Sequence, residues 1–246
     1  MGKMSLRRKY KNKRYRMKLS AVKNLLTKMA DPDKDMEDLT LALGFSSLVY
    51  FSNNFIIKKV SALNYPYKIL EYKDMKCLIV ETDHSIFIAF RGTETSRWLN
   101  WKRILNIIPR TFMDNLKVHG GFQLYFKEYM SYVNEFIESI NRPKKIIFTG
   151  HSLGAALAAL YNIHYTKSSE SIIFACPNFL FNSKFSCSNS YSYRILKDFV
   201  TWIPFDLPFM NWSKSTKSIR VKSVKNYWNP IMYHSLENYI RSILRG

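Results

Sequence analysis

Cysteine is scarce in this 246-residue sequence, and the three that occur stand far apart. Cys77, Cys176 and Cys187 are an odd number, and their spacing matches no metal-ligand pattern. This argues against a disulfide framework and indicates small buried thiols in a reducing compartment. We therefore expect neither a metal nor any other cofactor.

A long uninterrupted hydrophobic run is also missing. The longest apolar-rich stretch, Ile146 to Ile163, is interrupted by Thr149, His151 and Ser152, which favours a buried strand and helix over a membrane span. The basic N-terminus has no apolar run of the length that a signal peptide needs. We expect a protein that resides in the cytoplasm or at the periphery of a membrane.

Internal repeats and linkers rich in glycine and serine are absent, and glycine occurs only eight times. With 47% hydrophobic residues, the chain can bury a large core. We predict a single domain over residues 31–246, preceded by a basic tail over residues 1–30. The oligomeric state is left open.

Positive charge is concentrated in this tail. The net charge is +20, and the first 28 residues hold eleven Lys or Arg and no acid. The plainest interpretation is a solvated segment that cannot bury enough apolar area to offset its chain entropy. Contact with an anionic membrane is the main alternative, and nucleic acid is the less favoured partner. A helical spacing predicts that the tail ends in an amphipathic helix packed on the domain, formed by Leu19, Val22, Leu25, Leu26 and Met29.

Strand-like and helix-like patterns alternate along the rest of the chain. Strands are predicted at residues 67–72, 76–81, 85–91, 145–149, 171–176, 191–196 and 218–224, and helices at 35–51, 122–140, 153–166 and 234–244. Such alternation predicts an α/β fold whose mostly parallel central sheet carries helices on both faces.

The most informative motif is a serine between two glycines, Gly150-His151-Ser152-Leu153-Gly154, at the junction of a predicted strand and a predicted helix. This context is typical of a nucleophile elbow, a sharp turn that exposes the serine hydroxyl at the edge of a sheet. The flanking glycines, Gly150 and Gly154, let the strand and helix backbones approach closely. A bare G-x-S-x-G pattern is common by chance. Its position between a predicted strand and a predicted helix is what makes Ser152 a candidate nucleophile.

A serine hydroxyl is a weak nucleophile until a base accepts its proton, and the sequence offers five histidines. The chain order in sheet hydrolases of this kind is serine, acid, histidine, which eliminates His84, His119 and His151. His164 lies about 18 Å along the elbow's own helix, too far for a hydrogen bond. His234 remains as the base.

Three acids lie between the serine and this histidine: Glu170, Asp198 and Asp206. Catalytic groups gather at the carboxyl ends of parallel strands. Glu170 precedes its strand and would lie at the opposite end, whereas Asp198 directly follows one. We predict that Asp198 orients the imidazole and stabilises its protonated form, with Asp206 as the reserve candidate.

An oxyanion hole needs donors where negative charge develops. The backbone N–H of Leu153 is one candidate. The second could come from Arg91-Gly92-Thr93 or from His119-Gly120-Gly121. The oxyanion loop normally lies further upstream of the elbow than the second segment does, so we prefer Thr93.

Taken together, these motifs resemble the class 3 lipases, the fungal-type triacylglycerol lipase family of α/β-hydrolases. Five segments carry the resemblance, in family order: Ala89-Phe90-Arg91-Gly92-Thr93-Glu94 with Trp98 downstream, Val118-His119-Gly120-Gly121-Phe122, Thr149-Gly150-His151-Ser152-Leu153-Gly154, Asp198-Phe199-Val200 with Ile203-Pro204, and Tyr233-His234. Three segments depart from the family pattern without removing a reacting group: Ala155, Ala175-Cys176-Pro177 and Lys197.

The resemblance implies hydrolysis of a carboxylic ester in a lipid, most simply an acylglycerol, by a triad of Ser152, Asp198 and His234, with Thr93 and Leu153 at the oxyanion. The resemblance also implies a lid. An apolar face that would suit a lid is formed by Trp98, Trp101, Ile104, Leu105 and Ile108. Otherwise these residues would belong to the core. Two alternatives stay open. One is phospholipase or acyltransferase chemistry on the same triad, and the other is a non-catalytic lipid-binding protein with a hydrolase fold.

Overall fold

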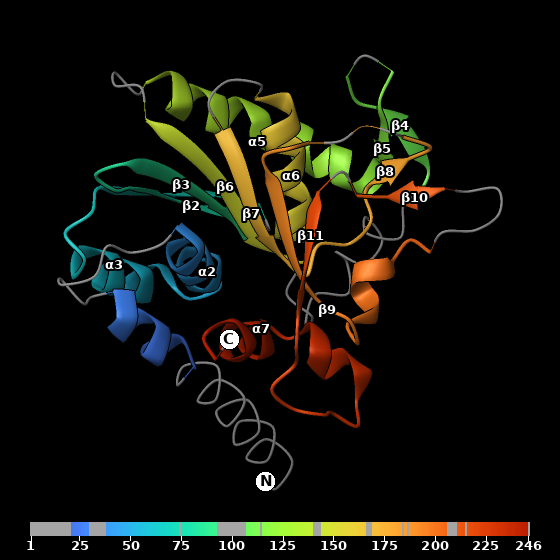
Figure 1. The fold of residues 1–246 in the computed structure, drawn as a ribbon. Coiled ribbons are helices and arrows are strands. Elements are labelled where there is room, and N and C mark those ends of the chain that lie inside the picture. The colour runs from blue at the N-terminus through green and yellow to red at the C-terminus, as the bar shows by residue number, and fades with distance from the viewer. Residues whose placement is uncertain are drawn as a thin grey trace, which may run out of the picture.

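A sheet of seven strands forms the centre of the protein in a computed structural model (Figure 1). The structure describes residues 21–29, 38–73, 75–92, 107–113, 115–139, 144–165, 169–183, 185, 187–205, 211–214 and 216–245. The strands in spatial order are β1 (Tyr67–Tyr72), β2 (Met75–Glu81), β3 (Ser85–Phe90), β6 (Lys145–His151), β7 (Ser169–Phe174), β9 (Ser190–Ile195) and β11 (Lys217–Val221). All seven predicted strands are present, with ends that differ from the prediction by at most three residues.

The sheet is antiparallel at one edge and parallel elsewhere. β1, β2 and β3 form an antiparallel meander, and every pair from β3 to β11 is parallel. β3 is buried along its whole length, as expected for a central strand covered on both faces. Its last residue, Phe90, lies opposite Gly150 of β6, so the carboxyl ends of the two central strands meet at one edge.

Helices cover both faces of the sheet and create two apolar cores (Figure 1). α5 (Gly120–Glu138) and α6 (Leu153–His164) pack on one face. α2 (Asp38–Leu48), α3 (Asn53–Ser61) and α7 (Leu236–Ile243) pack on the other. This arrangement confirms the predicted α/β fold with a mostly parallel sheet. Among the described residues, no helix combines the length and the apolar character needed to cross a bilayer.

The helical segment at residues 21–29 belongs to the second core. Leu25 is fully buried, and the sulfur of Met29 lies next to Gly44 of α2. The apolar stripe predicted at the end of the basic tail therefore packs on the domain, for the residues of it that are described. The division of the chain near residue 30 stays a prediction.

Some elements were not predicted from the sequence. A small antiparallel sheet consists of β4 (Pro109–Thr111), β5 (Lys117–His119), β8 (Leu180–Phe181) and β10 (Trp212–Ser213). Its strands of two or three residues are too short for a period-two pattern to be recognised. α3 was missed as well, since its sequence has only two buried residues, Ile56 and Val60.

The predicted helix at 234–244 is wrong at its start. His234 instead ends a short 3₁₀ helix, η2 (Pro230–His234), and α7 begins at Leu236. Ser235 separates the two in an extended conformation, and its hydroxyl caps α7 by accepting a hydrogen bond from the backbone N–H of Asn238 (3.3 Å). The helix predicted at 35–51 ends earlier, at Leu48, and residues before Asp38 lie outside the described part of the chain.

Candidate active site

Ser152 lies on a sharp turn between β6 and α6. Its backbone has φ 60° and ψ −125°, a conformation that side-chain-bearing residues adopt at a cost. Its backbone N–H donates to the carbonyl of Phe174 in β7 (3.1 Å), which fixes the turn at the carboxyl edge of the sheet. The strand, the strained turn and the helix have the geometry expected of a nucleophile elbow.

The two elbow glycines stand where no side chain fits. A Cβ at Gly154 would overlap the carbonyl oxygen of Phe90, at the end of β3. A Cβ at Gly150 would overlap the backbone of Gly154 itself. The first turn of α6 therefore lies directly against the ends of β3 and β6, as the spacing of the two glycines predicts.

The structure brings Ser152, His234 and Asp198 into one hydrogen-bonded chain. The distance from Ser152 Oγ to His234 Nε2 is 2.8 Å, and His234 Nδ1 lies 2.9 and 3.0 Å from the two carboxylate oxygens of Asp198. Because the carboxylate can only accept, Nδ1 carries the proton and Nε2 is left free to accept from the serine hydroxyl. These three residues come from the ends of β6 and β9 and from η2, segments far apart in the sequence.

Asp198 is fully buried, and its oxygens have further donors. The backbone N–H of Val200, in the 3₁₀ helix η1 (Phe199–Trp202), donates to Oδ1 (3.1 Å). The hydroxyl of Tyr239, in α7, donates to Oδ2 (2.8 Å) and accepts from the backbone N–H of Ile195 (3.1 Å). Burial and the nearby Asp198 raise the pKa of Tyr239 well above its usual value, so the hydroxyl keeps the proton that it donates.

Sequence reasoning missed Tyr239. The signal available was its place five residues after His234, on the buried side of the last helix, where a tyrosine requires a partner for its hydroxyl. A buried tyrosine alone does not indicate which partner it has, so the contact with Asp198 emerged only from the structure.

His151 contacts His234 without taking its place in the hydrogen-bonded chain. Its Nε2 lies 2.9 Å from the backbone oxygen of His234, and the two imidazole rings are 4.9 Å apart. The carbonyl of His151 accepts a hydrogen bond from the hydroxyl of Tyr50 (3.3 Å), which in turn accepts from the backbone N–H of Gly92 (3.0 Å). The elbow is thus tied to η2 on one side and, through Tyr50, to the segment after β3 on the other.

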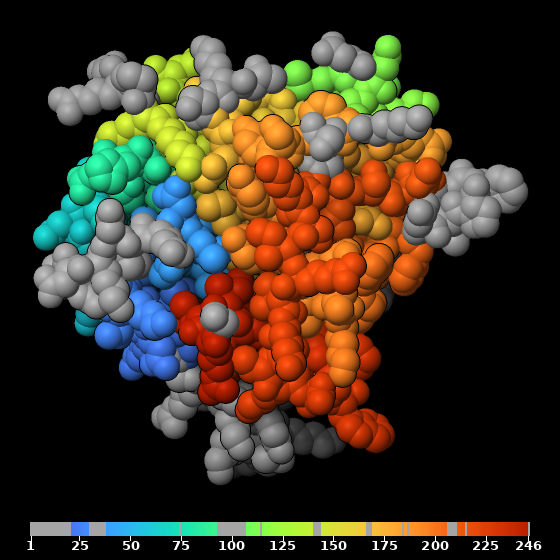
Figure 2. All heavy atoms as spheres, viewed as in Figure 1, coloured from blue at the N-terminus to red at the C-terminus, as the bar shows by residue number. Residues whose placement is uncertain are grey.

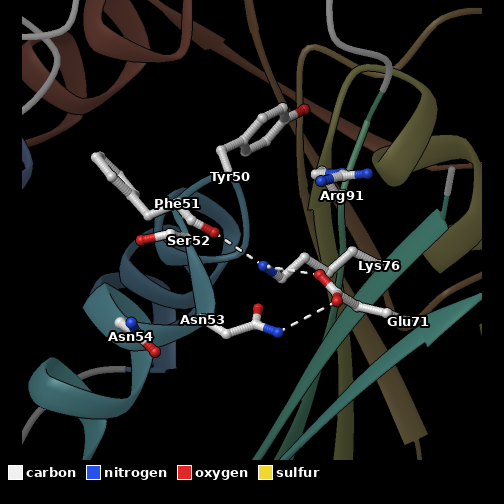
Figure 3. A pocket seen from close by; sticks show the side chains of 8 residues that line it. All are labelled: Tyr50, Phe51, Ser52, Asn53, Asn54, Glu71, Lys76 and Arg91. Carbon is white, nitrogen blue, oxygen red and sulfur yellow. Dashed lines mark hydrogen bonds and ion pairs between the residues drawn. The ribbon is translucent and has the colours of Figure 1, made fainter.

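A polar cavity of about 390 Å³ lies beside this segment (Figure 3). Lys76 Nζ donates to the carbonyl of Phe51 (2.8 Å) and pairs with Glu71 (3.2 Å), while Arg91 extends from the end of β3 on the same side. Partial burial acts to raise the pKa of Glu71, but hydrogen bonds from Lys76 and Asn53 hold it below its usual value. No triad residue lines the cavity. The cavity therefore adjoins the segment that leads from β3 to Gly92 and not the reacting groups.

Lys214 is a second residue that the sequence did not single out. Its ammonium donates to the carbonyls of Cys176, in the turn after β7, and of Thr201, in η1. It therefore fastens η1, and with it the position of Asp198, to the edge of the sheet. Burial lowers the pKa of Lys214 to about 8.

The structure also describes some of the other candidate residues that the sequence offered for the acid, the oxyanion hole and the lid. Glu170 pairs with Lys145 (2.9 Å) at the amino end of its strand, away from the triad. The backbone N–H groups of His119 and Gly120 already donate to the carbonyls of Phe179 (2.9 Å) and Ile108 (3.1 Å), so they are not oxyanion donors. Ile108 itself is 67% exposed. The remaining candidates, Thr93, Trp98, Trp101, Ile104, Leu105 and Asp206, lie outside the described residues.

The sheet order, the elbow and the hydrogen-bonded Ser–His–Asp set define an α/β-hydrolase. Residues 87–207 match the family model described as Lipase (class 3). This segment includes the elbow, the acid and the strands around them, so just under half of the chain matches the class 3 lipase family, as the motifs indicated. A search among curated proteins found no match.

Solved structures of lipases have the same fold. The mono- and diacylglycerol lipase from Aspergillus oryzae is 19% identical with a TM-score of 0.61, over 80% of this chain and 83% of that one. The Rhizomucor miehei triacylglyceride lipase is 18% identical with a TM-score of 0.58, over 74% and 78%. A triacylglycerol lipase whose catalytic centre is described as a serine protease triad is 18% identical with a TM-score of 0.57, over 77% and 80%. At these identities the likeness concerns the fold.

Removing the Tyr239 hydroxyl should impair the site without removing a reacting group. We expect Tyr239→Phe to lower kcat for a short soluble ester about tenfold with KM nearly unchanged, because a charged hydrogen-bond partner contributes about 1.5–3 kcal/mol. Steady-state kinetics and urea unfolding of the same samples measure the two effects. Tyr132→Phe, which alters an exposed hydroxyl on α5, is the matched control. If Tyr239→Phe lowers stability but leaves kcat unchanged, the Tyr239 hydroxyl serves packing alone and the prediction is wrong.

Lys214 should make stability depend on pH in the alkaline range. Its pKa is about 8 in the folded protein and about 10.4 when unfolded, so between these values the unfolded state binds more protons. The contribution of this group to stability therefore increases as pH rises from about 8 to about 10. We expect the stability difference between wild type and Lys214→Met, measured by urea unfolding, to change in this direction. Lys217→Met, at an exposed position, should show no such change.

Proposed function

We propose that this protein is a serine lipase that hydrolyses carboxylic esters of lipids through an acyl-enzyme on Ser152. The observation that carries the proposal is the continuous hydrogen-bonded chain from Ser152 Oγ through His234 to the buried Asp198. A serine hydroxyl, an imidazole in the correct tautomer and a carboxylate that orients it are the parts that acyl transfer requires.

The geometry supports the following sequence of steps. His234 Nε2 accepts the hydroxyl proton as Ser152 Oγ attacks the ester carbonyl, and Asp198 stabilises the resulting imidazolium. The backbone N–H of Leu153 and a donor from Thr93 would stabilise the oxyanion. His234 then returns the proton to the leaving alcohol, and the acyl group stays on the serine. Water, deprotonated by the same imidazole, releases the fatty acid and restores the serine.

Acylglycerols are the substrate class that the comparisons favour, because the similar solved structures are described as acylglycerol lipases. An apolar lid formed by Trp98, Trp101, Ile104, Leu105 and Ile108 would suit such a substrate.

The net charge of +20 favours one second candidate, an anionic phospholipid cleaved on the same triad. Profiling of head groups and chain lengths with purified protein separates the two. An acyltransferase would instead pass the acyl group to an added alcohol, and a non-catalytic lipid-binding protein would release no fatty acid.

A fluorophosphonate probe tests activation of the serine. Wild type should be labelled and Ser152→Ala should not, while Ser218→Ala, at an exposed position on β11, should be labelled like wild type. Ser152→Ala or His234→Ala should lower turnover of an ester by about 10⁶, and Asp198→Ala by less. Equal labelling of wild type and Ser152→Ala would contradict the proposal.

We also propose that the basic tail makes peripheral contact with anionic membranes. Since residues 21–29 pack in the core, a truncation should stop at residue 20, which removes nine of the eleven cations in the first 28 residues. This truncation should weaken binding to anionic vesicles at low salt, because each basic residue near the surface contributes about 1 kcal/mol. It should leave hydrolysis of a short soluble ester unchanged. Vesicle binding equal to that of the full chain would overturn the tail's role.

A further inference from the structure

Exposed apolar side chains gather on the two segments that carry Asp198 and His234. Six of the 13 large apolar side chains exposed in the described residues lie within residues 196–205 and 228–231. They are Leu196, Phe199, Trp202, Phe205, Trp228 and Ile231, and we call this set the η1–η2 surface. Trp228 has its whole side chain in solvent, with a relative exposure of 103%. Large groups of exposed apolar side chains are typical of interaction sites.

The two segments lie side by side. The hydrogen bond from His234 to Asp198 joins the end of η2 to the start of η1 (2.9 Å), and the two 3₁₀ helices are in contact. Lys197 strengthens the junction, since its ammonium donates to the side chain of Asn226 (2.9 Å) and lies over the ring of Tyr233 (5.7 Å from its centre). The orange and red segments at the lower right of Figures 1 and 2 show this proximity. The six side chains thus lie on two adjoining segments beside the triad.

The flank of this region is strongly basic. Between Phe199 and Leu236 the sequence has five Lys or Arg and a single acid, Asp206. Four of these cations, on β11 and in the loop that leads from it to Trp228, are exposed: Lys217, Arg220, Lys222 and Lys225. The guanidinium of the half-buried Arg194 lies over the ring of Trp202 (4.8 Å), which places another positive charge next to this side chain.

We propose that the η1–η2 surface docks this protein onto an anionic lipid surface. Tryptophan favours the boundary between headgroups and acyl chains, where its ring is partly apolar and its N–H stays hydrated. Binding of this kind increases with the apolar area inserted and with attraction between basic residues and anionic lipids, and this region supplies both. The choice of lipid as partner rests on the proposed function. Docking would bring the segments that bear the acid and the base to the lipid, next to the esters they act on.

The test measures vesicle partitioning without turnover. In a Ser152→Ala background, full-length protein is mixed with vesicles of phosphatidylcholine alone or with 30% phosphatidylserine, and bound protein is separated by sedimentation. Trp228→Ser should lower the partition coefficient for the anionic vesicles about tenfold, since removal of one inserted aromatic ring costs about 1.5 kcal/mol or more. Because this ring makes no packing contact in the fold, the variant should unfold at the same urea concentration as its parent.

A control variant and a second readout accompany the partitioning measurement. Ile57→Ser, on α3 and about as exposed as Trp202 (41% against 43%), should leave partitioning unchanged. Tryptophan fluorescence should shift to shorter wavelength on binding in the parent and less in the Trp228→Ser variant. Equal binding to neutral and anionic vesicles, or a Trp228→Ser and Trp202→Ser double variant that binds like its parent, would overturn the proposal. Hydrolysis of a soluble ester by protein with Ser152 intact tests the proposed function separately.

Discussion

The close approach of α6 to the ends of β3 and β6 is the constraint on which the site depends. Gly154 lies against the carbonyl of Phe90, so the helix begins immediately after the strand and Ser152 must complete the turn alone. This turn aims the serine at the carboxyl edge of the sheet, where β7 and β9 also end. The acid and the base need only be held at that edge to reach it.

A buried polar network holds Asp198 and His234 at the carboxyl edge of the sheet. Tyr239 links Asp198 to the backbone of β9, His151 links the elbow to the loop of His234, and Lys214 links η1 to the turn after β7. Each contact satisfies a group that would otherwise be buried without a partner, which is costly in a medium of low polarity. Precision at the triad and stability of this edge of the sheet therefore have the same physical origin.

Local sequence patterns were enough to predict the central strands, the elbow helix and the turn at Ser152. β3, β6 and α6 are apolar runs that the sequence shows directly, and the glycines around Ser152 mark a turn of known geometry. Chain order and elimination then reduced the acids and histidines to Asp198 and His234, which the structure brings together. Short strands such as β8 carry no periodic signal, and the break before α7 depends on one capping serine. Tyr239 and Lys214 were missed because their partners are main-chain atoms or side chains distant in sequence, and only the fold makes them neighbours.

The backbone of Ser152 has a consequence for how this protein can be improved. At φ 60° and ψ −125°, a glycine would occupy the same position with less strain, since it has no Cβ to clash. Selection for thermal stability alone would therefore favour loss of the nucleophile at this position. Stability and chemistry oppose each other at this one residue, so engineering for robustness has to draw its gains from elsewhere in the fold.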